Sequence, residues 1–169
     1  AVLKAEARRV RFVALADWAA ERGIAAVATA HHADDQAETL LMRLQRGSGI
    51  AGLSGIRAIR HEGDLAILRP VLGWTKAELT QIVRQSGIEP VDDPSNRDPR
   101  FDRARLRGRL ADMPWLEPLA LARSAAALAE AEAALQWSAD RLWDERVLAD
   151  GNRLILDPAG VPPELKRRL

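Results

Sequence analysis

The stretch Ile24-Ala-Ala-Val-Ala-Thr-Ala-His-His-Ala-Asp-Asp-Gln-Ala-Glu-Thr39 decides the fold class. Its first seven residues form a short apolar run between a helix-ending glycine and a polar cluster, which is typical of a buried strand. A helix is predicted from Asp34 or Asp35 to Arg46, and another over about 3–22, where apolar residues recur at helical spacing. Helix, strand and helix in this order predict a parallel α/β sheet with crossover helices.

The remaining elements follow from apolar runs, turn residues and caps. Two short apolar segments on either side of Glu62-Gly63-Asp64 predict a hairpin. Thr75 and Glu78 form a capping box that starts a helix ending near Ser86. Alanine- and leucine-rich sequence then predicts one long helix. The expected segments are strands at 56–60, 65–69 and 89–92, an irregular loop at 93–101, and the long helix at 117–148.

Leucines recur every seven residues along this long helix, at positions 121, 128, 135 and 142. Such a seam would suit a coiled-coil homodimer. Two of the other core positions of such a seam would hold charged residues, Glu132 and Arg146. We therefore favour a helix that packs within its own chain or bridges two domains, and the homodimer stays open as an alternative.

The composition excludes several classes of function. The 169 residues include no cysteine, which rules out disulfides, cysteine-ligated metals and thiol catalysis, and fits a reducing compartment such as the cytoplasm. The formal net charge is only +1, yet 22 of the 25 basic residues are arginine, whose planar fork suits phosphates and carboxylates. No apolar stretch is long enough to predict a membrane span, and charges interrupt any signal-peptide pattern.

Titratable residues gather where the predicted strand ends, namely His31, His32, Asp34, Asp35 and Glu38. Ligands of open α/β sheets bind outside the carboxyl ends of strands, which favours a functional site here. Asp35 and Glu38 share one helical face and could hold Mg²⁺ or orient a cationic nucleophile. A capping box from Asp35 to Glu38 would also explain both acids. The two histidines point to opposite sides of an extended backbone, which disfavours joint metal ligation.

The glycine-rich segment Gly47-Ser-Gly-Ile-Ala-Gly52 matches the dinucleotide-binding pattern G-x-G-x-x-G. That pattern requires a preceding strand, whereas this segment follows a predicted helix. We interpret it as a backbone-exposing loop beside Arg46 that could contact phosphate or substrate. A plain helix end followed by a turn explains the glycines equally well.

Six arginines lie within residues 97–109. Side chains at positions i, i+2 and i+4 spread around a helix, so some are expected to meet internal acids such as Asp92 and Asp93. Others could reach a nucleic-acid backbone or a triphosphate. Solvated or internally paired arginines are the alternative interpretation.

Five ordered motifs resemble the tRNA(Ile)-lysidine synthetases, a family of the N-type ATP pyrophosphatase superfamily. They are His31–Thr39, Arg46–Leu53, Arg69–Leu72, Asp92–Asn96 and Phe101–Arg107. The resemblance implies part of a Rossmann-like (adenine nucleotide alpha hydrolase-like) parallel sheet over residues 1–113. A mainly helical region over 114–169 would begin a tRNA-binding domain.

The same resemblance implies a two-step ligation of L-lysine to the wobble cytidine of the isoleucine tRNA with a CAU anticodon. ATP with Mg²⁺ would adenylate the base carbonyl oxygen, and the lysine amine would then displace AMP. Asp35 and Glu38 match acidic residues on the ATP/Mg²⁺ or lysine side, with Asp35 as the metal ligand. Arg103 and Arg105 match basic residues near the activated base, although alanine replaces an asparagine between them. The expected nucleotide-binding residues are His31, His32, Arg46 and Gly47.

The nucleotide loop of that superfamily, Ser-Gly-Gly-x-Asp-Ser, is absent from this sequence, which opens on Ala1 rather than Met. We therefore expect a fragment that alone neither binds ATP tightly nor forms lysidine. Two alternatives of other classes stay open. In a metal-dependent phosphoesterase, two metals would be held by His31, His32, Asp34 and Asp35. In a noncatalytic RNA-binding module, the arginines of 97–109 would bind many RNAs with salt-sensitive affinity.

Overall fold

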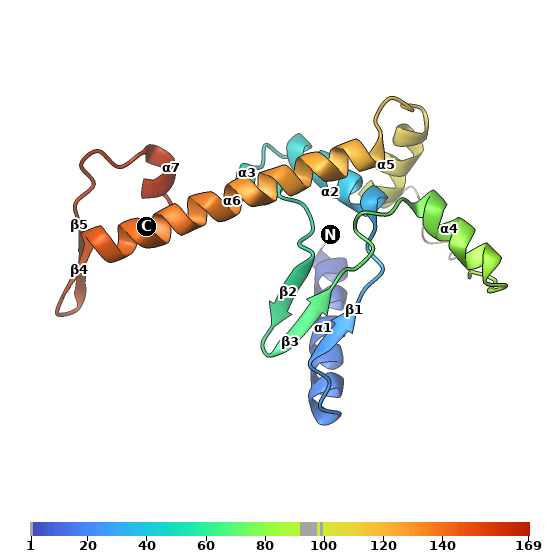
Figure 1. The fold of residues 1–169 in the computed structure, drawn as a ribbon, viewed down its shortest axis with the longest axis horizontal. Coiled ribbons are helices and arrows are strands. Elements are labelled where there is room, and N and C mark those ends of the chain that lie inside the picture. The colour runs from blue at the N-terminus through green and yellow to red at the C-terminus, as the bar shows by residue number, and fades with distance from the viewer. Residues whose placement is uncertain (1, 92–97, 99) are drawn as a thin grey trace.

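A three-stranded sheet lies between helices in the computed structural model, which describes residues 2–91, 98 and 100–169 (Figure 1). Its strands, in spatial order, are β1 (Ala26–Ala28), β3 (Leu65–Leu68) and β2 (Ile59–Glu62). β1 runs parallel to β3, with Val27 opposite the fully buried Ile67. β2 and β3 form an antiparallel hairpin. The parallel pair confirms the predicted α/β crossover, and the hairpin was also predicted, although its first strand lies three residues later than expected.

Two helices frame the first strand. Helix α1 (Val2–Glu21) buries Phe12 and Ala19, and its end is fixed by a hydrogen bond from the Ile24 amide to the Ala19 carbonyl at 2.9 Å. Helix α2 (Ala33–Gln45) begins five residues after β1 and carries the acidic cluster. Its first turn is therefore held at the carboxyl end of β1.

The capping box predicted at Thr75 starts helix α4 (Lys76–Gln85). The Glu78 amide donates to Thr75 Oγ1 at 3.2 Å, and the Thr75 amide donates to Glu78 Oε2 at 2.7 Å. The short strand predicted at 89–92 is wrong over residues 89–91, where the backbone is irregular and Val91 is 95% exposed, so no apolar contact stabilises a strand. The rest of that prediction, and most of the loop at 93–101, lie outside the described residues.

The segment 47–55 is more ordered than the predicted loop. It contains a single-turn helix, α3 (Ile50–Leu53), and Arg43 of α2 donates to the carbonyls of Gly52 and Gly55. The arginine thereby satisfies carbonyls that a loop would leave to water. This glycine segment follows α2, as predicted, and therefore lacks the strand that a dinucleotide-binding turn requires.

A side-chain amide joins α2 to the chain that leads into the sheet. Gln36 Nε2 donates to the Ile56 carbonyl at 2.7 Å, and its Oε1 accepts from the Ile56 amide at 2.6 Å. Gly55, at φ +66°, turns the backbone so that both groups face Gln36. Because Gln36 is buried, these two hydrogen bonds take the place of water for the amide and the carbonyl of Ile56, which lies outside the strands.

The predicted long helix is α6 (Pro118–Arg146), which runs along one side of the molecule (Figure 1). It packs on α2 and α3, burying Ala125, and Ser54 Oγ donates to the Leu128 carbonyl at 3.2 Å. Packing within its own chain, the favoured interpretation, is therefore present, whereas the homodimer stays a prediction. No helix in the described part of the chain is both long and apolar enough to cross a membrane.

The end of α6 carries a second small unit whose hairpin was not predicted, since the long helix was expected to continue to residue 148 and instead ends at Arg146. Strands β4 (Val147–Asp150) and β5 (Arg153–Leu156) form an antiparallel hairpin, and the short helix α7 (Pro163–Lys166) folds back toward α6. Arg168 holds this end of the chain against α6 through ion pairs with Glu132 of α6 at 2.8 Å and with Glu164 of α7 at 2.9 Å. Both carboxylates raise the pKa of Arg168, and this charged cluster holds the last residues against α6.

Candidate functional site

The acidic cluster begins at the cap of α2, where His32 rather than Asp35 is the N-cap residue. The His32 amide donates to Asp35 Oδ2 at 3.1 Å, so Asp35, the third residue of the helix, caps its first turn. The predicted capping box between Asp35 and Glu38 is therefore wrong by one turn. Since Glu38 takes no part in the cap, its burial requires another explanation.

That explanation is Arg107 of helix α5 (Asp102–Ala111). The Glu38 side chain is only 2% exposed, and Arg107 donates to both of its oxygens, from Nε to Oε1 and from Nη2 to Oε2 at 3.2 Å. Arg107 Nη2 also lies 3.6 Å from Asp35 Oδ1. The Glu38 carboxylate raises the pKa of Arg107. One guanidinium thus faces two carboxylates across the α2–α5 contact.

Asp34 makes separate contacts, which connect α2 to α4. Its Oδ2 accepts from the Lys76 amide at 2.8 Å and lies 3.4 Å from His32 Nδ1. At that distance the histidine contact is electrostatic, since Nδ1 has no hydrogen-bond partner among the residues described. The carboxylate of Asp34 raises the pKa of His32, and protonated His32 in turn lowers the pKa of Asp34.

The structure brings some predicted site residues together and separates others. Arg103 Nη2 donates to Thr39 Oγ1 at 3.2 Å, beside Glu38 on α2. Arg105 is on another side of α5, where it pairs with Asp102. His31 Nδ1 lies 2.9 Å from Thr29 Oγ1. Arg46 and Gly47 lie at the far end of α2 from the acids, and Gly47 has the positive φ of a helix end.

Arg107 belongs to the arginine-rich segment but was not singled out from the sequence. The signal was available, because residues four apart share a helical face, and Arg103 and Arg107 have that spacing. It was missed because only the spacing of two between neighbouring arginines was considered, which spreads the side chains around a helix. Asp92, Asp93 and Arg97 lie outside the described residues, and so do the contacts that were expected between these acids and the arginines.

A cavity of 320 Å³ opens between α2, α5 and the start of α6. Carboxylates of Asp34, Glu38 and Glu117 lie on its wall, together with Arg107. Apolar side chains complete the lining, namely Ala37, Leu110, Ala111, Met113, Pro114, Leu116 and Pro118. A long aliphatic chain with a cationic end fits these walls, since the stem can contact the apolar part while the charge approaches a carboxylate.

A dedicated metal centre is not formed by the residues that the structure describes. No group of three or more histidine, aspartate or glutamate side chains converges among them. The predicted phosphoesterase needed His31, His32, Asp34 and Asp35 on one pair of metals, whereas His31 Nδ1 lies 2.9 Å from Thr29 Oγ1. A Mg²⁺ ion that brings substrate phosphates needs only one or two carboxylates, and Asp35 fits that smaller requirement.

The ion pair of Glu38 and Arg107 gives a testable stability prediction. Arg107→Gln leaves a buried carboxylate without its charged partner, and we expect the free energy of unfolding to fall by about 2 kcal/mol. The Glu38→Gln, Arg107→Gln double variant removes both charges, so it should cost at least about 1 kcal/mol less than the sum of its single changes. Urea unfolding of the four proteins measures this coupling, and additive losses would contradict the pairing.

The contact of His32 with Asp34 predicts a pH dependence in metal-free buffer. Because the folded state raises the pKa of His32 above 6.5, its contribution is complete below about pH 6.5 and is lost as the pH rises through the folded pKa. Asp34 has its pKa lowered below 3.8, so its contribution exists above about pH 4 and is lost as the pH falls further. The destabilisation caused by His32→Gln should be larger at pH 5.5 than at pH 8.5, by on the order of 1 kcal/mol.

Chemical unfolding at both pH values measures that difference. The matched control is His61→Gln, which replaces an exposed histidine on β2 that makes no ion pair with a described residue. A destabilisation by His32→Gln that is the same at both pH values would show that the Asp34 contact does not favour the protonated imidazole.

Comparison with known proteins places this site in a family. Residues 1–113 match the model of the PP-loop domain. The chain is 51% identical over 150 residues to the tRNA(Ile)-lysidine synthase of Novosphingobium aromaticivorans, which covers 86% of this chain and 46% of that protein. It is 43% identical over 171 residues to the tRNA(Ile)-lysidine synthase of Zymomonas mobilis, covering 99% of this chain and 52% of that protein.

The tRNA(Ile)-lysidine synthase of Ruegeria pomeroyi is 40% identical over 172 residues, with 99% of this chain and 41% of that protein covered. The chain spans about half the length of the curated relatives it matches. These likenesses confirm the resemblance predicted from the five motifs, and they give no support to a phosphoesterase or a noncatalytic RNA-binding module. The PP-loop domain is a Rossmann-like α/β fold, in agreement with the predicted fold class, and since the match covers more than half of the residues, the chain belongs to the PP-loop domain family.

Proposed function

We propose that this chain is part of an ATP-dependent ligase that joins L-lysine to the wobble cytidine of the isoleucine tRNA with a CAU anticodon. The names of the relatives support the substrate class. The observation that carries the proposal is the cavity lined by carboxylates next to the first turn of α2, at the carboxyl end of β1. Ligands of open α/β sheets bind at such strand ends.

The cavity suits the amine that attacks in the second step. Its carboxylates would hold the lysine ε-ammonium, and its apolar wall would contact the four-carbon stem. The amine must lose a proton before it attacks, and a neighbouring carboxylate of Asp34 or Glu117 can accept it. Glu38 is less suited to this role because Arg107 already engages both of its oxygens.

The first step transfers an adenylyl group to the base carbonyl oxygen. A bond forms from that oxygen to the α-phosphorus of ATP, and pyrophosphate leaves. When bound, Mg²⁺ would neutralise charge on the phosphates, with Asp35 as its protein ligand. Arg103 contacts Thr39, the residue of α2 that follows Glu38. It would stabilise the transferring phosphate, as cationic donors do. In the second step the amine nitrogen bonds to the base carbon, and AMP departs with the oxygen.

Other assignments stay proposals of the same kind. His31 and His32 would lie on the nucleotide side, whereas Arg46 and Gly47, which were expected there too, lie at the other end of α2 from His32. We assign residues 1–113 to the catalytic domain and residues 114–169 to the start of a tRNA-binding region. Helix α6 belongs to the second region and joins it to the first, because it packs on α2 and α3 while its end carries the β4–β5 hairpin.

Formation of lysidine tests this function directly. The intact protein is incubated with ATP, Mg²⁺, L-lysine and the isoleucine tRNA, and the digested nucleosides are analysed by mass spectrometry. We expect lysidine at the wobble position, with one AMP and one pyrophosphate released per lysine joined. A methionine tRNA with the same anticodon serves as the control for tRNA identity. Hydrolysis of phosphoesters without lysidine would refute the proposal.

A further inference from the structure

The alternating arginines of α5 form two rows on different sides of the helix. Residues two apart are separated by 200° around a helix, whereas residues four apart nearly superimpose. Arg103 and Arg107 form the first row, and their partners are Thr39 and Glu38 of α2. The second row, Arg105 and Arg109, has no place in the acidic site.

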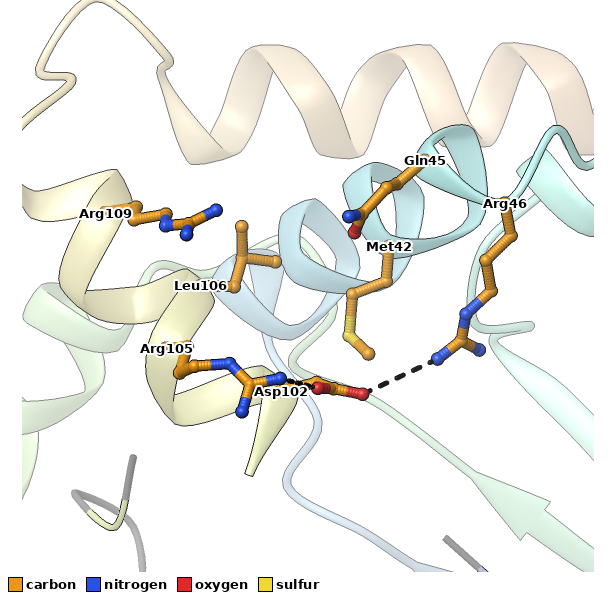
Figure 2. A pocket seen from close by; sticks show the side chains of 7 residues that line it. All are labelled: Met42, Gln45, Arg46, Asp102, Arg105, Leu106 and Arg109. Atoms are coloured by element: carbon orange, nitrogen blue, oxygen red, sulfur yellow. Dashed lines mark hydrogen bonds and ion pairs between the residues drawn. The ribbon is translucent and has the colours of Figure 1, made fainter. Parts of the chain in front are cut away.

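This second row lines a separate cavity of 420 Å³ between α5 and the C-terminal half of α2 (Figure 2). Arg46 reaches into it from the end of α2, so three guanidinium groups share this space. Asp102 is the sole carboxylate among the lining residues, and Arg105 and Arg46 approach it from two sides. The remaining lining residues are Met42, Gln45 and Leu106.

The cavity carries an excess of positive charge that an anion could neutralise. Arg46 Nη2 is 3.9 Å from Asp102 Oδ2, and the two side chains are 65% and 59% exposed. Exposed ion pairs of this kind are weak, so an incoming anion can compete with Asp102. Arg109 forms no ion pair with any residue in the described ranges. Guanidinium groups bind phosphate through paired hydrogen bonds, which makes phosphate the fitting anion.

We propose that this cavity binds a backbone phosphate of the RNA substrate and thereby positions the tRNA on the α2–α5 surface. This inference rests on the proposed function. A phosphate of the reacting nucleotide is less suitable, because Arg46 is eight residues beyond Glu38, about 12 Å along the helix. The ligand at this cavity is therefore part of a longer molecule, and an RNA backbone supplies phosphates at such separations. Phosphate contacts position nucleic acids without reading their sequence.

The test compares Arg109→Gln with a charge-matched control, Arg22→Gln, at an exposed arginine directly after α1 and outside the region assigned to tRNA binding. Binding of labelled isoleucine tRNA to the intact protein is measured by fluorescence anisotropy at several salt concentrations. We expect Arg109→Gln to weaken binding about fivefold near 0.1 M salt and to reduce the slope of log affinity against log salt by about 1. The Arg46→Gln, Arg109→Gln double variant should lose more, whereas Arg22→Gln should keep both values.

A parallel titration with ATP and Mg²⁺ distinguishes the two sources of phosphate. Unchanged ATP affinity in Arg109→Gln supports the RNA assignment, whereas weakened ATP binding with normal tRNA binding would overturn it. Equal losses in Arg109→Gln and Arg22→Gln would also overturn it, since they would reflect net charge alone. If Arg109→Gln binds tRNA with normal affinity and the intact protein forms lysidine, only this inference is refuted. A protein that binds no tRNA removes the proposed function as well.

Discussion

Asp35→Asn is expected to lower lysidine formation by about 100-fold or more while the unfolding midpoint stays nearly unchanged. An asparagine oxygen can still accept the hydrogen bond from the His32 amide, so the first turn of α2 keeps its closure. What is lost is the negative charge that we propose for Mg²⁺ or the lysine ammonium. Single-turnover lysidine formation and thermal unfolding of the intact protein measure the two effects separately.

The control for this change is Asp140→Asn on α6, an exposed aspartate that accepts a hydrogen bond from Gln136 at 2.9 Å. It removes the same charge far along α6 and should alter neither quantity. If Asp35→Asn lowered stability and activity in proportion, Asp35 would be a capping residue only. A normal reaction rate in Asp35→Asn would remove it from the proposed site.

The second large effect is expected for stability, from Gly55→Ala. Gly55 has φ +66°, and a Cβ at this position would collide with Gln36 Oε1 and lie 3.2 Å from Ala125 Cβ. The collision displaces the amide that satisfies both backbone groups of Ile56. Left-handed backbone and overpacking together should lower the free energy of unfolding by about 3 kcal/mol. Urea unfolding followed by circular dichroism measures the loss.

Gly63→Ala provides a matched control for the backbone contribution. Gly63 in the β2–β3 turn has φ +58°, but no atom lies within 4 Å of an added Cβ. The strain of a left-handed alanine remains there without the collision, so we expect a loss of about 1 kcal/mol. Equal losses at the two positions would show that the contact of Gly55 with Gln36 contributes nothing.

Local sequence signals predicted the elements that depend on neighbouring residues. The capping box at Thr75 and the helix of residues 118–146 were found because caps and apolar periodicity act within a few turns. The strand expected near residue 90 failed because a strand needs a partner, and sequence alone does not show that Val91 meets none. The hairpin of β4 and β5 was missed although its two-residue Gly151-Asn152 turn is a hairpin signal, because the long helix was expected to continue to residue 148 and its strands show little alternation.

The candidate site was predictable in its residue types but not in its pairs. The position of Asp35 and Glu38 after a buried strand was enough to propose a site. The partner of Glu38 depends on how α5 lies against α2, across 69 residues of sequence. Arg103 and Arg105 were both chosen because they match basic residues of the resembled family, whereas the helix places them on different sides. Arg107, one turn beyond Arg103, makes the contact instead.

The hydrogen bond from the Lys76 amide to Asp34 depends on the number of residues between β3 and α4. A residue inserted between Leu68 and Lys76 would shift the start of α4 along its axis and withdraw that amide from the carboxylate beside His32. The β2–β3 turn, which no part of the site contacts, can vary in length without this effect. Proteins that keep this cluster should therefore vary freely in the hairpin turn and hold the spacing from Leu68 to Lys76 constant.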